Sequence, residues 1–493
     1  MATGIPFPFP APVNGINTRE AVGALQPTEA RSLENWFPFG TSLRQRNGRA
    51  VSSSGMGSSP VLTLDVYQGE SSQKLIAVSD GTIWDASGTT ASSLYAGSYT
   101  DSRFQTAMYN GYMYGVNGID TPWSYNGSTV GALGWTGTAL TLSNLVNVAY
   151  VRNRVWFCEK SRARVWYGGI GDISGTLTAF DLGQVAGGGY CMAIGSWSRD
   201  AGDGMDDQTV FIMSTGEIII YEGDPGGTFS KIGAYNGPEP IGRQCYTRVG
   251  GELIIWTKAG LIPITAYLSG IAYDARAYGN HGKVAPSLTS DWQSYSSNTQ
   301  WAIGQAEGAI YLSVPVIDGS SHKIWVMNTR NGAWTTYPNF PAPCMAELNG
   351  TLYFGGYGGQ VYSHTGNDDD GEPIIMRARG AYVAPNAANK MKADAVALDM
   401  TVTGDLSGRV GFDVDFNENT LPNGQAIISQ SINTTPWGSS WGSPWGRKNQ
   451  FPGQYIGTLG YGQFFGLALE AYGNSDQVEW YGARALMTPS GAL

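Results

Sequence analysis

The sequence has 493 residues, with 69 glycines, 27 tyrosines and 16 tryptophans, and only 14% of its side chains are charged. This composition is typical of a turn-rich, aromatic-rich all-β protein, and the length suits either two to four domains or one large repeat domain. The formal net charge of −10 excludes a globally basic surface for gripping nucleic acid.

The chain begins with an apolar, proline-rich segment, IPFPFPAPV, at residues 5–13. Proline at alternate positions favours an extended, polyproline-type arm that cannot fold on itself. A frayed terminus would explain the prolines, but Phe7 and Phe9 would be unusual in a solvent-exposed tail. We therefore expect both phenylalanines to dock on a neighbouring subunit or a partner protein.

Residues 27–37 (PTEARSLENWF) predict a short helix, because Thr28 can cap it and Glu29 suits its first turn. On such a helix one face would hold Ala30, Leu33 and Phe37. Residues 43–49 (LRQRNGR) then place three arginines around an Asn-Gly turn, and we expect them to anchor into acidic neighbours. Residues 1–59 are thus predicted as an extended arm, a short helix and an anchor segment.

A repeated strand pattern organises the middle of the chain. Residues 344–366 predict three strands, with Asn349-Gly350 as the first turn, because a type I′ turn needs positive φ at both central residues. Similar turns, each followed by an aromatic or β-branched strand, occur at Gly81, Gly111, Asn153, Gly216, Gly251 and Gly308. The mean spacing of these markers is about 45 residues, which is typical of four-stranded propeller blades. We predict a β-propeller of six or seven blades over residues 60–370.

Signals for catalysis or ligand chemistry are weak in this sequence. The four cysteines, Cys158, Cys191, Cys245 and Cys344, show no C-x-x-C spacing, which favours buried free thiols over disulfides. The three histidines, His281, His322 and His364, show no metal-ligand spacing. The acidic stretches 198–208 and 367–372 do not match a calcium loop. We predict no catalytic, cofactor-binding or metal-ligating residue.

The last region, residues 371–493, changes to longer alternating strands and predicts a C-terminal β-sandwich. Asp413 and Asp415 alternate with apolar residues, so we expect both carboxylates on the solvent face. Residues 436–448 (PWGSSWGSPWGRK) predict a loop, since its glycines and proline disfavour a helix. The loop tryptophans are Trp437, Trp441 and Trp445. They would either pack on the sandwich or form an exposed docking surface toward sibling subunits, glycan or membrane.

Four phrases together resemble the tail nozzle (tail hub, or DNA-stabilisation) proteins of short-tailed bacteriophages. They are LQPTEARSLENWFPFGTSLRQRNGR at 25–49, YNGYMYGVNGIDTPWSYNG at 109–127, NRVWFCEKSRARVWYGGIGD at 153–172, and a final strand containing WYGARALM. The resemblance implies a non-enzymatic virion protein, made in the host cytoplasm, whose six copies form a ring below the tail adaptor. It also implies double-stranded DNA passing through the lumen without sequence-specific binding, and a tailspike or fibre nearby.

Two other function classes remain open from the residues. One is a glycan-binding propeller, in which exposed tryptophans act as sugar platforms. The other is a glycoside hydrolase, which would need a suitably spaced pair of carboxylates. No run approaches the ~18 apolar residues of a membrane span, and residues 3–12 lack the features of a signal peptide.

Overall fold

The computed structural model describes residues 4–70, 72–200, 205–402, 406–418, 425–427, 449–450, 455–473 and 477–492. The chain divides into two compact units. The terminal unit comprises Met1–Ala50, Trp325–Pro338 and His364–Leu493, and the propeller unit comprises Val51–Ile324 and Asn339–Ser363. Both ends of the chain therefore belong to one unit, whereas the sequence predicted separate domains at 1–59 and 371–493.

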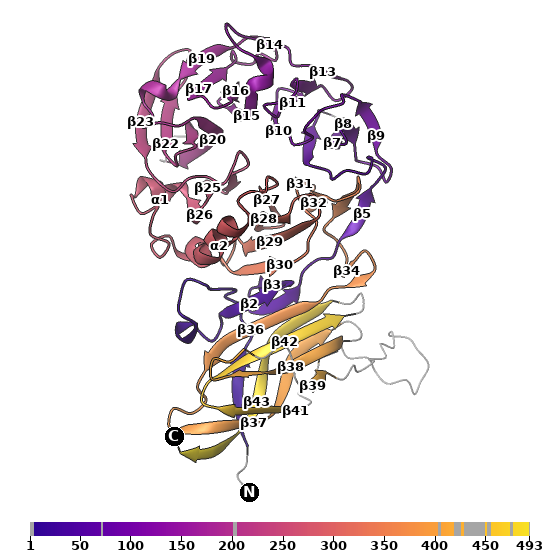
Figure 1. The fold of residues 1–493 in the computed structure, drawn as a ribbon, viewed down its shortest axis with the longest axis vertical. Coiled ribbons are helices and arrows are strands. Elements are labelled where there is room, and N and C mark those ends of the chain that lie inside the picture. Colours follow the sequence, from indigo (N-terminus) through magenta and orange to yellow (C-terminus); the bar gives the residue numbers. More distant parts are fainter. Residues whose placement is uncertain are drawn as a thin grey trace. The chain divides into compact units, whose positions relative to one another are not determined.

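The propeller unit is a ring of small antiparallel sheets (Figure 1). Four sheets of four strands follow one another in chain order. The first comprises β6 (Thr63–Gln68), β7 (Gln73–Ser79), β8 (Thr82–Asp85) and β9 (Ser92–Tyr95), and the second comprises β10 (Gln105–Tyr109), β11 (Tyr112–Val116), β12 (Trp123–Tyr125) and β13 (Val130–Ala132). The third comprises β15 (Leu145–Val151), β16 (Arg154–Glu159), β17 (Arg164–Tyr167) and β19 (Thr178–Asp181), and the fourth comprises β20 (Cys191–Asp200), β21 (Met205–Met213), β22 (Ile218–Gly223) and β23 (Phe229–Tyr235). Between the second and third of these sheets, β14 (Trp135–Thr136) pairs in parallel with β18 (Gly175–Thr176).

The remaining strands of the propeller unit complete the ring. They are β24 (Tyr246–Val249), β25 (Glu252–Thr257) and β26 (Gly260–Pro263); β27 (Ala302–Ala306), β28 (Ala309–Ile317) and β29 (Ser321–Asn328), which leaves the unit at Ile324; and β31 (Met345–Leu348), β32 (Thr351–Gly355) and β33 (Val361–Ser363), whose sheet is completed by β5 (Ala50–Ser53). The helices α1 (Ile264–Leu268) and α2 (Ala285–Tyr295) lie between β26 and β27 in sequence. The predicted propeller, with six or seven blades, is confirmed.

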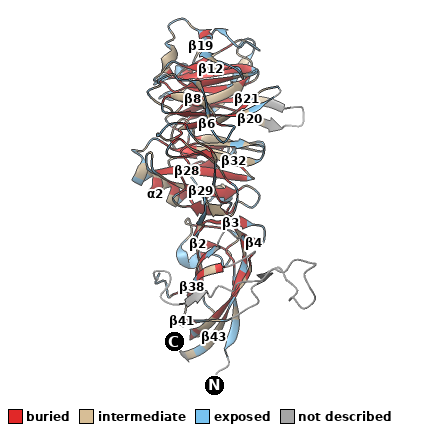
Figure 2. Ribbon diagram, turned by 90° about the vertical axis from the view of Figure 1, so that its right-hand side faces the viewer, coloured by how far each residue is buried: buried red, intermediate tan, exposed pale blue. Residues whose placement is uncertain are grey.

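The first strand of each sheet contacts the next sheet around the ring, from β6 through β10, β15, β20, β24 and β27 to β31 and back to β6. Buried apolar side chains fill the spaces between neighbouring sheets, as between Ile76 of β7 and Met113 of β11. Figure 2 shows this burial running through the blades. The core of the unit is thus divided into interfaces between blades, which are filled by aliphatic and aromatic side chains.

The predicted turn chemistry is confirmed at six of the seven marker positions, and at the seventh the positive φ falls on Gly250 instead of Gly251. Asn349 and Gly350 have φ of 53° and 78°, and they join β31 to β32 in the predicted meander. Positive φ also occurs at Gly81, Gly111 and Asn153. Since only glycine and, to a lesser degree, asparagine tolerate this backbone region easily, the turns hold the blade strands in register.

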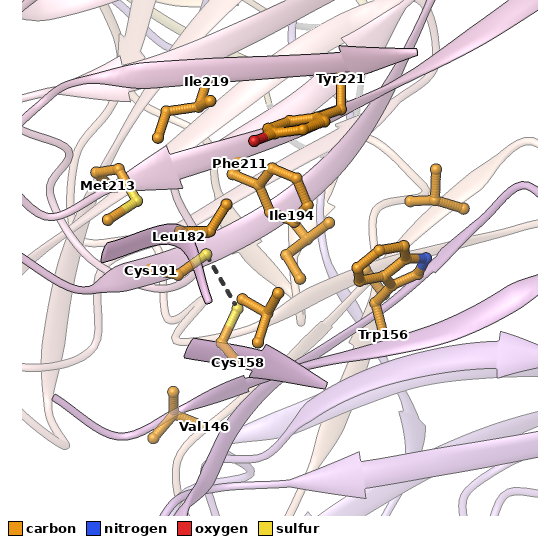
Figure 3. Packing of buried hydrophobic residues seen from close by; sticks show 13 residues of the cluster. Val146, Trp156, Cys158, Leu182, Cys191, Ile194, Phe211, Met213, Ile219 and Tyr221 are labelled. Atoms are coloured by element: carbon orange, nitrogen blue, oxygen red, sulfur yellow. Dashed lines mark hydrogen bonds between the residues drawn. The ribbon is translucent and has the colours of Figure 1, made fainter. Parts of the chain in front are cut away.

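The cysteines are all buried and free, as predicted. Cys158 of β16 and Cys191 of β20 meet across the space between two blades, with their sulfur atoms 3.5 Å apart (Figure 3). Their surroundings are apolar, with Trp156, Ile194 and Phe211 in the same cluster. These thiols therefore serve as small core residues.

The terminal unit contains two sheets. One has the order β3 (Trp36–Phe39), β4 (Ser42–Gln45), β43 (Val478–Ala492), β37 (Asn389–Val402) and β40 (Asn449–Gln450), with β1 (Ile5–Pro10) on β43 and β41 (Ile456–Gly462) on β37. The other has the order β30 (Trp334–Tyr337), β2 (Ala30–Glu34), β36 (Met376–Val383), β42 (Phe465–Gly473), β38 (Leu406–Val414) and β39 (Gln425–Ile427). A short hairpin joins β34 (Asp368–Asp369) to β35 (Glu372–Pro373). Strands from the first 50 residues thus complete both sheets.

The N-terminal arm is extended, but it folds back on its own unit. β1 pairs antiparallel with β43, from Ile5 opposite Met487 to Pro10 opposite Gly482. In an edge strand only alternate residues direct their N–H groups to the neighbouring strand, so proline at the other positions removes no ladder hydrogen bond. The prediction of an extended arm is confirmed. The arm pairs with β43 of its own unit, and alternate prolines are compatible with such an edge strand.

The predicted helix at residues 27–37 is wrong. This stretch forms β2 and β3, separated by Asn35, which has a φ of 59°. β2 pairs with β36 on one side and with β30 on the other. Two pairing strands therefore override a weak local preference for helix. The predicted anchor is confirmed, because Arg46 forms hydrogen bonds of 2.9 and 2.6 Å to the two carboxylate oxygens of Asp369.

The expectation for the two carboxylates of β38 and its turn is only half correct. Asp415 is exposed, but Asp413 is 1% exposed. Its Oδ2 lies 2.6 Å from a guanidinium nitrogen of Arg31 and 2.6 Å from one of Arg379. Alternation placed Asp413 on the face opposite Phe412, and that face is occupied by arginines of β2 and β36 rather than by solvent.

Candidate functional site

Of the predicted contact residues, the structure describes Phe7 and Phe9. Phe9 is 4% exposed and packs on Phe412, with ring centroids 5.1 Å apart, while Phe7 is half-buried against Phe9. Both side chains serve the core of the terminal unit. The tryptophans Trp437, Trp441 and Trp445 lie outside the described residues.

The propeller unit contains a cavity of about 510 Å³. Its wall includes residues that precede or begin the first strands of several blades, such as Arg103 before β10, Arg243 before β24 and Trp301 before β27. Because these strands are the innermost ones around the ring, the cavity lies on the propeller axis. A cavity of this size is large enough for a small-molecule ligand.

Three cations and one carboxylate line this cavity, namely Arg103, Lys160, Arg243 and Asp101. Each cation donates a hydrogen bond to a backbone carbonyl: Arg103 to Trp301, Arg243 to Asn117 at 2.6 Å, and Lys160 to Gly118 at 3.0 Å. Among the described residues none of the three forms an ion pair with a carboxylate. The wall therefore has an excess of positive charge.

Backbone groups engage the carboxylates around these cations. Asp318, which acts electrostatically on Arg103, accepts a hydrogen bond of 2.9 Å from the backbone N–H of Thr299. Asp101 Oδ1 accepts a hydrogen bond of 2.8 Å from the backbone N–H of Arg103. Burial opposes ionisation of Asp120, but hydrogen bonds from the N–H groups of Asp101 and Thr100 and from the Asn117 amide outweigh it and lower the pKa of that carboxyl. Asp101 and Asp120 stabilise the loops, and neither receives a hydrogen bond from a guanidinium.

The two arginines oppose each other electrostatically. Burial and then repulsion from Arg243 lower the pKa of Arg103 to about 10. Burial also lowers the pKa of Arg243, while the Asp101 carboxylate acts in the opposite direction. Both side chains remain positively charged at pH 7, because arginine loses its proton only far above that pH. Two like charges held together in this way are stabilised by any anion placed between them.

The rest of the cavity wall is aromatic and amide-bearing. Trp301 is 4% exposed and packs against Trp292 of α2, with ring centroids 5.1 Å apart. Gln105 and Gln300 also line the wall and are buried. The cavity thus combines apolar surface, hydrogen-bonding amides and positive charge.

The sequence analysis did not predict this cluster of cations. Arg103, Lys160 and Arg243 are 57 and 83 residues apart and do not belong to one basic stretch. The usable signal is positional: Arg103 and Arg243 each lie two to three residues before the first strand of a blade, and in a ring of blades such positions converge on the axis. Without knowledge of the strand boundaries, this convergence is invisible.

Among the described residues, no group of three or more His, Cys, Asp or Glu residues is placed to hold a metal ion. In the same part of the chain, no helix is both long enough and apolar enough to cross a membrane.

The ring of sheets and its axial cavity define a β-propeller protein with a second β unit. Similar solved structures include the WD40 β-propeller domain of Doa1 (13% identity, TM-score 0.38, covering 64% of this chain and 96% of that one). Others are the extracellular domain of BT4673 from B. thetaiotaomicron (7%, 0.43, 88% and 61%) and BBS1N in complex with ARL6DN (9%, 0.40, 67% and 96%). No family model and no curated protein sequence matches the chain.

Proposed function

We propose that this chain is a structural virion protein, a subunit of the nozzle ring that extends and closes the DNA ejection channel below the tail adaptor of a short-tailed phage. The observation that supports it most is the structural position of the phrases that resemble tail nozzle proteins. Residues 25–49 supply β2, β3 and β4, and the phrase WYGARALM lies in β43, which pairs with β1, β4 and β37. The resemblance therefore concerns residues that build the fold.

The two central phrases that resemble nozzle proteins, at 109–127 and 153–172, also supply strands of the fold. Residues 109–127 contain β11 and β12, and residues 153–172 contain β16 and β17. Trp123 and Trp156 of these strands are each 1% exposed. A shared pattern of buried aromatic residues in neighbouring blades supports a common fold with the nozzle proteins, and from that fold we infer the common role.

In a ring of this kind each subunit presents two different patches, one to each neighbour. Since β1 is paired within its own unit, we place the contacts on the exposed faces of the units rather than on the arm. Partners in this proposal are five sibling copies, the adaptor and a nearby tailspike or fibre. DNA passes through the lumen without sequence-specific contacts.

The mass of the purified protein in solution tests the proposal. Light scattering over a concentration series, with and without the candidate adaptor, should give about six times the subunit mass of 52.6 kDa, either alone or on the adaptor. A monomer at every concentration, indifferent to the adaptor, would refute the nozzle function.

Glycan recognition is the second candidate, because the cavity wall contains Trp292 beside the amides of Gln105 and Gln300. Aromatic faces with nearby amides are suited to sugar rings and hydroxyls. Saturable binding of an uncharged sugar by the monomer, weakened by Trp292→Ala, would support this function. Unchanged affinity in that variant would exclude the cavity as the sugar site.

A further inference from the structure

The positive charges of the cavity share one rigid support. The side chain of Asn117 is fixed by a hydrogen bond of 2.9 Å to the Asp101 carbonyl and one of 2.8 Å to Asp120. The carbonyls of Asn117 and Gly118 in turn accept from Arg243 and Lys160. Two cations from different blades are therefore held beside each other by consecutive peptide groups.

Arg103 approaches from the loop before β10, and its guanidinium is fixed by the Trp301 carbonyl. In the hydrogen bonds of these two arginine side chains, each guanidinium uses one N–H nitrogen. A guanidinium has five N–H donors in a fixed fork. Both arginines consequently retain donors that no described protein group occupies.

Holding the three cations in one cavity wall costs free energy unless an anion binds between them. Arg103 and Arg243 are partly buried, and Lys160 is exposed. Like charges drawn out of water repel, and such a cation is normally paired with a carboxylate or another anion. The three cations of the wall exceed its single carboxylate by two charges. From this charge balance and the unused donors, we propose that the axial cavity is a binding site for a doubly charged oxyanion, a phosphate group that is either free or part of a small phosphorylated molecule.

Phosphate fits the geometry of the donors as well as the charge. A phosphate monoester has a charge of about −1.5 to −2 at pH 7 and three strong acceptor oxygens. Arginine binds such oxygens through its planar fork, and lysine adds a point charge. The volume of about 510 Å³ leaves space beside the phosphate for an attached group, with Trp292 and Gln105 on the wall. This inference is independent of the nozzle proposal.

Isothermal titration calorimetry on the full chain tests the site. Inorganic phosphate and glucose 6-phosphate are titrated at constant ionic strength, with chloride and glucose as controls for the charge and for the sugar. We expect saturable binding of one phosphate group per chain. Equal affinities would assign the site to free phosphate, and tighter binding of glucose 6-phosphate would assign it to a phosphorylated small molecule.

The variants Arg103→Gln and Arg243→Gln should each weaken phosphate binding about 10-fold or more, the effect of losing one charge-assisted hydrogen bond. Arg248→Gln is the matched control, because Arg248 is an exposed arginine of β24 outside the cavity wall. Lys160→Gln serves if the arginine variants do not fold, since Lys160 is exposed. Absence of saturable phosphate binding, or equal affinities in the cavity variants and Arg248→Gln, would overturn the proposal. Binding of glucose with no effect of phosphate would overturn it too.

Discussion

Replacing Phe9 with alanine tests whether the N-terminal arm belongs to the core of the terminal unit. The Phe9 ring is 4% exposed and lies 5.1 Å from the ring of Phe412, which in turn contacts Phe465 at 5.9 Å. Phe9 therefore links β1 of one sheet to β38 of the other. If this packing is structural, its loss should destabilise an isolated, monomeric chain.

The expected magnitude follows from the burial of the ring. Truncation of a buried phenylalanine to alanine costs about 3–5 kcal/mol. Phe9 lies on an edge strand that can partly relax, so we expect a value near the lower limit, about 3 kcal/mol. Phe7→Ala should cost about half as much, because Phe7 is only half-buried and contacts mainly Phe9, at 5.3 Å.

Urea unfolding followed by hydrogen exchange of peptides from β1 and β43 measures this effect locally. Phe9→Ala should lower the midpoint of the terminal unit and speed exchange in Val478–Ala492, with little change in propeller peptides. Arg248→Gln, in the propeller unit, is the control. Unchanged exchange in β43 with Phe9→Ala would show that the ring adds nothing to the terminal unit and would restore the docking interpretation of the arm.

Three further outcomes are expected. Asp413→Asn should destabilise the terminal unit by about 3 kcal/mol in urea unfolding, because it removes the buried carboxylate that Arg31 and Arg379 share, while Arg31 keeps its ion pair with Glu418; a loss below about 1 kcal/mol would contradict this. Burial lowers the pKa of His322 to about 4 from its ordinary value of 6.5. The neutral, buried His322 therefore contributes to the free energy of unfolding above pH 6.5, and this contribution of ~3 kcal/mol is lost as the pH falls toward 4. His322→Gln should not show this loss when the free energy of unfolding is measured against pH, and identical curves for the two proteins would refute the prediction. Burial also raises the pKa of the Cys245 and Cys344 thiols to about 12. Native protein at pH 8 should therefore leave these thiols unmodified by a thiol reagent until it is unfolded, and rapid native labelling of either would be the contrary result.

The blades could be predicted from sequence because their turns have strict backbone requirements. Gly111, Gly308 and Gly350 join the first and second strands of their blades, whereas Gly81 and Gly216 join the second and third. The markers thus fall one to a blade but at different places within it, which explains their irregular spacing of 30 to 63 residues. The turn type is local information, but the position of a turn within its blade is not.

The terminal unit shows where local information fails. Residues 27–37 satisfy a helical pattern of cap and apolar face, yet β2 is paired on both sides by strands more than 290 residues away in sequence. Asp413 likewise lies in an alternating pattern that is typical of a solvent-exposed position. Its carboxylate can be buried because Arg31 and Arg379 form ion pairs with it. In both cases the deciding partner is distant, and no window around the residue contains it.

The internal pairing of the arm changes how an assembly experiment on it must be interpreted. Deleting residues 2–13 would remove β1 from β43 and uncover Phe412, so loss of a ring could follow from an unstable subunit instead of a lost contact. Arm contacts would be supported only if the deletion abolished the ring while exchange in β43 stayed unchanged. Because β43 also pairs with β37 along nearly its whole length, the chain without residues 2–13 should retain the sheet. Its amide hydrogens should exchange faster only in the part of β43 that β1 no longer covers. A retained sheet with faster exchange there would favour subunit contacts elsewhere on the two units.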